Sequence, residues 1–197
     1  MKKLLSLLLA ALLCVCSLTP VFAEAGDSLF SMFGTDRKEE SFPYTLNDYK
    51  LYFDILADSV LGVTPVWTTT ANGAEAALEG FGVVKVETNA EGKVTRLSTA
   101  MTVEPTDQEA ISNLGMVMAL MAMTSKASED ISFIAANADS YTEQLLAPLY
   151  ELIGRIGDAV SGKTISATGD VYGDTATFSL SIDMTKMTMT LELVYEP

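Results

Sequence analysis

Residues 157–164, Gly-Asp-Ala-Val-Ser-Gly-Lys-Thr, match the phosphate-binding loop pattern GxxxxGK[ST] letter for letter. In such a loop, a strand leads into a glycine-rich turn, and the following helix points its positive end at the phosphates. Here the order is reversed, because the segment follows a helical pattern and precedes an alternating, strand-like one. We therefore interpret Gly157–Thr164 as a helix-to-strand turn without a nucleotide site.

Four methionines, at positions 116, 118, 121 and 123, have a spacing that invites comparison with Cu(I) sites. On a helix, consecutive residues turn by about 100°, so Met116 and Met123 lie on one side and Met118 and Met121 lie nearly opposite. A single metal site cannot use all four, and flexible core packing is the ordinary role of methionine. An alternative function is the carriage of an apolar ligand, with Met116, Leu120 and Met123 lining its pocket.

Serine and threonine alternate with apolar residues along three C-terminal segments, a pattern that places the hydroxyl groups on one face of a sheet. Hydroxyl groups both donate and accept hydrogen bonds, and an indole ring offers a stacking surface. A glycan or protein partner would suit such a face, and its alternative interpretation is a solvated surface built from strand-forming residues. The candidate binding residues are Trp67, Thr168, Thr177, Ser179, Thr188 and Thr190.

Several catalytic chemistries are excluded by composition. The chain has no histidine, and its two cysteines, Cys14 and Cys16, lie in its first 23 residues. Disulfides, thiol nucleophiles, imidazole bases and Cys/His zinc sites are thereby excluded from the remainder. Carboxylate catalysis needs only two Asp or Glu side chains at a defined separation, but no motif selects a pair from the 26 acidic residues. We expect no catalytic residue, cofactor or metal ion, and keep a carboxylate-dependent extracellular hydrolase as an alternative.

The N-terminus predicts export. Residues 1–23 combine two lysines, an apolar run and a Val21-Phe-Ala23 cleavage pattern, as in a bacterial-type signal peptide. After cleavage, 10 basic and 26 acidic residues remain, a formal net charge of −16. A polyanion such as nucleic acid would be repelled by this surface. We expect a secreted or extracytoplasmic protein without a membrane span, with residues 24–43 as a linker or loosely docked arm and 44–197 as one domain.

Helical patterns alternate with strand patterns along that domain. A first helix is predicted from the Thr45 cap to Gly62. A strand follows at residues 65–71, and a hairpin is predicted from residues 81–88 and 93–103. A capping box, Thr106-x-x-Glu109, predicts a second helix from about Asp107, whose stretch 114–123 is apolar on every side and therefore expected at the centre of the domain.

Residues 126–130 then predict a polar break, residues 131–138 a short helix, and residues 140–160 a third main helix containing Pro148. Alternation beyond Gly162 predicts three antiparallel strands joined first by a Gly173-Asp174 link, with Met187 and Met189 on the core face of the last strand. The expected fold is α+β, in the order α-βββ-α-(α)-α-βββ, with an antiparallel sheet of about six strands and helices packed on one face. The expected function is that of a secreted, non-enzymatic binding protein.

Overall fold

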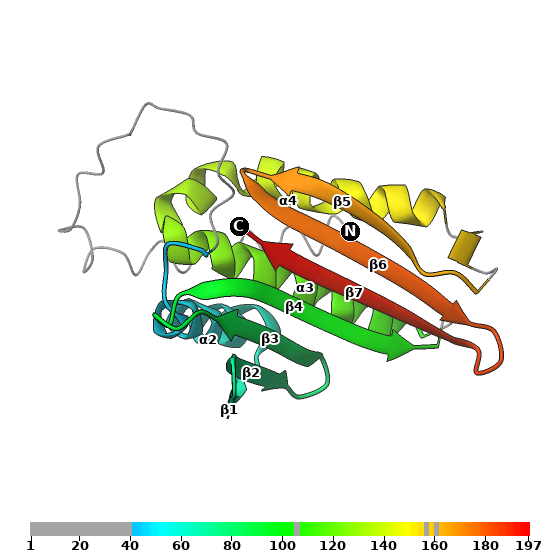
Figure 1. Cartoon of the computed structure of the whole chain (residues 1–197), viewed down its shortest axis with the longest axis horizontal. Helices are drawn as coiled ribbons and strands as arrows, with labels where there is room; N and C mark the ends of the chain where they lie inside the picture. The colour runs from blue at the N-terminus through cyan, green and yellow to red at the C-terminus, as the bar shows by residue number, and fades with distance from the viewer. Residues whose placement is uncertain (1–40, 105–106, 156–157, 160–161) are drawn as a thin grey trace.

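The computed structural model describes residues 41–104, 107–155, 158–159 and 162–197. The predicted signal peptide and most of the predicted arm lie outside these residues. The described chain forms three helices and seven strands (Figure 1). The helices are α2 (Leu46–Leu61), α3 (Gln108–Glu129) and α4 (Ile131–Gly154). The strands are β1 (Val66–Thr70), β2 (Gly73–Leu78), β3 (Gly82–Thr88), β4 (Val94–Val103), β5 (Ile165–Val171), β6 (Asp174–Asp183) and β7 (Thr188–Glu196).

All seven strands belong to one antiparallel sheet with the order β1-β2-β3-β4-β7-β6-β5. Two meanders, β1–β4 and β5–β7, meet where β4 pairs with β7, with Leu97 opposite Tyr195. The helices pack against one face, and Figure 1 shows α3 and α4 behind the strands. The α+β prediction is confirmed, with seven strands in place of about six.

The additional strand is β2, which pairs with both β1 and β3. Its alternate residues Ala74, Ala76 and Leu78 are buried against the helices. Alanine and glutamate are poor strand formers, so the sequence GAEAAL of β2 did not predict a strand. Pairing with a strand on each side stabilises the extended conformation that these residue types do not favour by themselves.

Helix α2 begins and ends as its sequence predicted. The Thr45 hydroxyl accepts a hydrogen bond from the Asp48 amide, and the Asp48 carboxylate accepts one from the Thr45 amide. Gly62 ends the helix in the left-handed region, with φ of 68°. Just before the helix, Phe42 is fully buried and its amide donates to the Val94 carbonyl at 2.8 Å. Phe42, within the predicted arm, is therefore part of the core.

Helix α3 is longer than predicted. Asp107, whose carboxylate accepts from the Ala110 amide, is its N-cap; Thr106 lies outside the described residues. The apolar stretch is the buried centre of the domain, as expected, with Leu114 and every residue from Val117 to Met123 buried. The predicted polar break at 126–130 is confined to Asp130, whose backbone is extended, because the helix continues to Glu129 and α4 begins at Ile131. The Lys126 side chain has buried partners in Glu129 of the same helix and Asp174 of the sheet.

Helix α4 is one continuous helix, so the predicted division into residues 131–138 and a start at Ser140 is wrong. Its first turn is capped by the Asp130 carboxylate, which accepts from the Ser132 amide at 2.8 Å. It ends at Gly154, earlier than predicted. Pro148 lies inside it and faces Gly169 of β5, where an added Cβ would lie 3.1 Å from the proline Cδ. The missing side chain of Gly169 lets helix and strand approach closely.

The C-terminal meander is confirmed, with two corrections. Tyr172 and Gly173, both with positive φ, connect β5 to β6, so Asp174 is the first residue of β6 and not part of the link. Met187, predicted on the core face, is exposed in the β6–β7 turn with φ of 53°. Because Met187 lies in the turn with a left-handed backbone and β7 begins only at Thr188, Met187 does not follow the alternation of the strand.

No helix within the described ranges is long and apolar enough to cross a membrane.

Candidate functional site

The outer face of the sheet, opposite the helices, is built largely of short hydroxyl side chains. On this face, Thr168 lies opposite Thr177, and Ser179 lies opposite both Ser166 and Glu192. Two cross-strand pairs form hydrogen bonds, Thr168 with Thr177 at 3.0 Å and Thr102 with Thr190 at 2.7 Å. These two contacts fix four of the hydroxyl groups. We call the following set of residues from β4 to β7 the hydroxyl face: Thr102, Ser166, Thr168, Thr175, Thr177, Ser179, Ser181, Thr188 and Thr190.

Five of the six predicted surface residues belong to the hydroxyl face. Thr168 is exposed, while Thr177, Ser179, Thr188 and Thr190 are partly exposed. They come from three adjacent strands, so the sequence alternation placed them together correctly.

Trp67, the sixth, lies elsewhere. It belongs to β1, at the far edge of the sheet, and points to the helix side. Its indole N–H donates to the Asp54 carboxylate at 2.7 Å, its ring meets Phe53 edge-on, and the Lys50 ammonium lies 4.8 Å from its centroid. The indole therefore joins β1 to α2 and is not brought to the hydroxyl face.

Several charged residues of the outer face form ion pairs between neighbouring strands, β2 with β3, β3 with β4 and, through Arg96 and Glu196 at 3.5 Å, β4 with β7. Lys85 lies 3.4 Å from Glu75, and Arg96 lies within 3.8 Å of Glu87. Exposed pairs of this kind contribute little to stability. Glu192, in contrast, lies among hydroxyl groups and Ala100 near the centre of the face.

The three residues predicted to line an apolar pocket lie along α3. Leu120 and Met123 are buried within the hydrophobic core, and Met116 is partly buried. Helix α3 packs against α2, α4, β3 and β4. The side chains of Leu120 and Met123 thus contribute to core packing, the ordinary role of a helix apolar on every side.

The residues around the predicted phosphate loop form a turn. Gly162 has φ of 82°, and its amide donates to the Ala159 carbonyl at 3.0 Å. Lys163 and Thr164 are exposed and β5 begins at Ile165. Gly157, Val160 and Ser161 lie outside the described residues.

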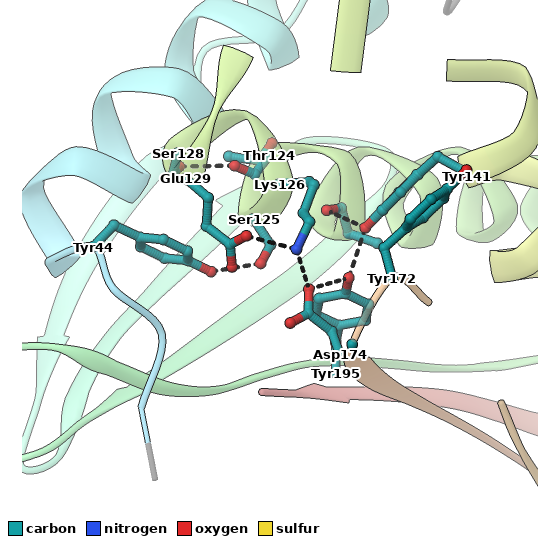
Figure 2. A network of polar contacts seen from close by, with 12 residues as sticks. Tyr44, Thr124, Ser125, Lys126, Ser128, Glu129, Tyr141, Tyr172, Asp174 and Tyr195 are labelled. Atoms are coloured by element: carbon teal, nitrogen blue, oxygen red, sulfur yellow. Dashed lines mark hydrogen bonds and ion pairs between the residues drawn. The ribbon is translucent and has the colours of Figure 1, made fainter. Parts of the chain in front are cut away.

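A second feature, which the sequence did not reveal, is a buried polar cluster between the end of α3 and the sheet (Figure 2). The Lys126 ammonium lies 2.6 Å from the Glu129 carboxylate and 3.4 Å from that of Asp174, with all three side chains no more than 16% exposed. Burial alone lowers the pKa of Lys126, but hydrogen bonds and charge from Glu129 and Asp174 outweigh it and raise that pKa overall. Lys126 is thus a buried cation held between two carboxylates.

Asp174 connects this cluster to a series of hydrogen-bonded tyrosine hydroxyl groups. The Tyr195 hydroxyl lies 2.7 Å from the Asp174 carboxylate, the Tyr141 hydroxyl lies 2.7 Å from that of Tyr195, and the Ala122 carbonyl lies 2.8 Å from Tyr141. Nearby, the Tyr44 hydroxyl lies 2.6 Å from that of Ser125. The contacts from Asp174 to Ala122 join β6, β7, α4 and α3 through three side chains and the backbone carbonyl of Ala122.

The number of hydrogens available for these contacts shows that this series of hydrogen bonds accommodates a proton on Asp174. Each phenol has one hydrogen to donate. With Asp174 ionised, Tyr195 donates to it, and Tyr141 then donates either to Tyr195 or to the Ala122 carbonyl, not to both. With Asp174 protonated, hydrogens run from Asp174 to Tyr195, to Tyr141 and to Ala122, and all three contacts are made. Burial also raises the pKa of Asp174, against the opposing effects of Tyr195 and Lys126.

The turn before Asp174 is fixed by the same region of α4. Tyr172 adopts φ of 54°, a left-handed conformation unusual for a residue with a side chain. Its hydroxyl hydrogen-bonds that of Ser140, its ring stacks on Tyr141, and its amide donates to the Gln144 side chain at 3.2 Å. These contacts hold Asp174 in position below Lys126.

The cluster is suited to structure rather than catalysis. Burial raises the pKa of four phenols well above the ordinary value, which keeps them neutral at physiological pH: Tyr44, Tyr49, Tyr141 and Tyr195, the four buried tyrosines. A charged Lys126 and neutral phenols are not nucleophiles, and the carboxylates of Glu129 and Asp174 are both engaged by the Lys126 ammonium. Asp174 is only 6% exposed, so a substrate would not reach it.

The sequence carried part of the signal for this cluster. Lys126 and Glu129, at a spacing of three, directly follow an entirely apolar stretch of helix, which is an unusual place for solvated charges. Their partner Asp174 is 48 residues away from Lys126, and no local pattern connects the two.

No family model, no curated protein and no solved structure matches the chain. The fold and these two features are therefore the basis for a functional proposal.

Proposed function

We propose that the protein is an exported, non-enzymatic binding protein whose recognition surface is the hydroxyl face. One observation carries the proposal: all three described helices pack on the opposite side of the sheet, and the side left uncovered by them presents ordered hydroxyl groups from β4 to β7. Export is supported by the signal-like residues 1–23.

The chemistry of the face favours a neutral, hydroxyl-rich partner such as a glycan. Threonine and serine both donate and accept hydrogen bonds, which matches sugar hydroxyls, and Glu192 adds a charged acceptor among them. The acidic chain disfavours polyanionic partners. Cross-strand contacts such as Thr168 with Thr177 hold side chains in place before binding, which lowers the entropy lost on binding.

The test is binding of the full chain to a panel of neutral polysaccharides, followed by removal of hydroxyl groups without loss of shape. Thr177→Val, Ser179→Ala and Thr190→Val, combined, delete three hydroxyls from adjacent positions of the face. We expect affinity to fall at least about tenfold, because each lost hydrogen bond contributes about 1 kcal/mol.

The matched control deletes hydroxyls from exposed helix positions, with Ser59→Ala in α2 and Ser112→Ala in α3. This control should bind as the unaltered protein does. Binding that survives the triple substitution, or the absence of binding to every neutral glycan tested, would contradict the proposal.

A further inference from the structure

The first strand of the sheet, β1, presents an edge that favours pairing with another strand. β1 pairs with β2 along its full length, from Val66 opposite Ala77 to Thr70 opposite Gly73. Among the residues that the structure describes, no strand pairs with its other side. The backbone N–H and C=O groups along such an edge are a template for a further strand.

This edge lacks the charges with which proteins usually prevent such pairing. No charged residue occurs between Gly62 and Ala74, although the chain has 26 acidic residues. The opposite edge, β5, carries Asp170 and has its Gly169 against Pro148 of α4. The unguarded edge of the sheet is thus β1.

The side chains of β1 are exposed but ordered. Val66 is 66% exposed, the largest value among the exposed large hydrophobic residues of the described chain, and Thr68, Thr69 and Thr70 are exposed as well. Trp67 anchors the strand through its hydrogen bond to Asp54. A strand already held in its extended conformation loses little entropy when a second strand joins it.

We propose that β1 pairs with β1 of a second copy of this chain, antiparallel and centred on Thr68. A two-fold axis then places Thr68 opposite its own copy and Val66 opposite Thr70 of the partner copy. Two acidic proteins repel each other over most of their surfaces, and the neutral edge is where two copies approach without bringing like charges together. The sheet becomes continuous across the axis, which places the two outer faces on the same side. This association is independent of the proposed glycan binding.

The test uses sedimentation of the full chain over a range reaching about millimolar concentration, since five residue pairs give a weak dimer. Thr68→Lys places two like charges opposite each other at the axis, as does Thr68→Glu, and directly opposed like charges destabilise a strand pair. We expect each variant alone to associate several-fold more weakly than the unaltered protein. A mixture of the two should associate more tightly than either alone, because Lys then faces Glu.

A change in net charge alone would not produce weaker association in both Thr68 variants and tighter association in their mixture. Thr68→Lys lowers the overall negative charge and would strengthen association if long-range repulsion controlled it. Ser166→Lys, at an exposed position of the opposite edge strand, is the matched control and should leave the dimer unchanged. Circular dichroism of each variant checks that the fold is retained.

A covalent measurement tests the register. Thr68→Cys in a chain with Cys14 and Cys16 replaced by serine supplies a sole thiol. Directly opposed residues in an antiparallel pair have Cα atoms about 4.5–5.5 Å apart, within the range that a disulfide bridges. Mild oxidation should give a covalent dimer, and Ser166→Cys should not. A protein that is monomeric throughout the range, a dimer indifferent to both Thr68 charges, or equal crosslinking at position 166 would overturn the proposal.

Discussion

Replacing Lys126 by methionine should expose the energetic role of the buried polar cluster. Methionine keeps the apolar stem but removes the ammonium that lies 2.6 Å from Glu129 and 3.4 Å from Asp174. Breaking a buried ion pair by removing one partner costs about 3–5 kcal/mol, because the other charge stays buried without compensation. Two carboxylates are left in that state, although at 8% and 16% exposure water relieves part of the penalty. We expect the free energy of unfolding to fall by about 3 kcal/mol at neutral pH.

The assay is urea unfolding followed by circular dichroism and by the fluorescence of Trp67, the single tryptophan of the chain. Lys85→Met is the matched control, because Lys85 lies 3.4 Å from Glu75 in a pair that is 60% and 40% exposed. Such a pair contributes below about 1 kcal/mol. Equal losses in the two variants would refute the assignment of Lys126 as a buried counter-charge.

Two further comparisons sharpen this test. Asp174→Asn should cost less than Lys126→Met, because Lys126 keeps Glu129 and no lone charge remains. Lowering the pH should reduce the difference in free energy of unfolding between Lys126→Met and the unaltered protein. Burial already raises the pKa of Asp174, and a carboxyl with a raised pKa favours folding fully below its ordinary pKa and loses that contribution as pH rises through the folded value. Loss of the ammonium raises this pKa further, so the variant gains more from acid.

Other predictions concern separate parts of the molecule. The four buried tyrosines have folded pKa values above the ordinary value of about 10, so their contribution to stability is complete below that pH and is lost as pH rises through the folded values; tyrosinate absorbance from them should appear only together with loss of circular dichroism. Gly169→Ala should reduce stability to urea by about 1–3 kcal/mol, since the added Cβ would lie 3.1 Å from Cδ of Pro148, whereas Gly154→Ala, with nothing within 4 Å, should not. Lys163→Ala should leave the melting temperature unchanged, and calorimetry should detect no nucleoside triphosphate binding to either protein; binding that the substitution abolishes would contradict the turn interpretation.

Local patterns predicted those parts of the fold whose causes are local. The cap at Thr45, the stop at Gly62 and the alternation within β5 to β7 depend on neighbours in sequence, and they were predicted correctly except at Asp174 and Met187, beside the turns. The hydroxyl face followed from the same alternation. These features needed only the periods of helix and strand.

The errors arose where distant residues decide local structure. A polar run from Lys126 predicted a break, yet α3 continues to Glu129, and the Lys126 ammonium lies 3.4 Å from Asp174 on another strand. A helix start was predicted at Ser140, but Ser140 lies inside α4 and hydrogen-bonds Tyr172. Trp67 was assigned to the binding surface because its partners Phe53 and Asp54 on α2 could not be paired with it from sequence alone.

The two faces of the sheet divide stability from recognition. The hydrophobic core, the polar cluster and the four buried tyrosines all lie between the sheet and its helices. Residues of the hydroxyl face such as Thr177 and Thr190 point the other way, and their hydrogen bonds are made among exposed side chains. Surface substitutions away from core features usually change stability by no more than about 0.5 kcal/mol. The hydroxyl face can therefore vary in sequence without loss of the fold, as a recognition surface requires, and substitutions that abolish binding there should leave the unfolding transition in place.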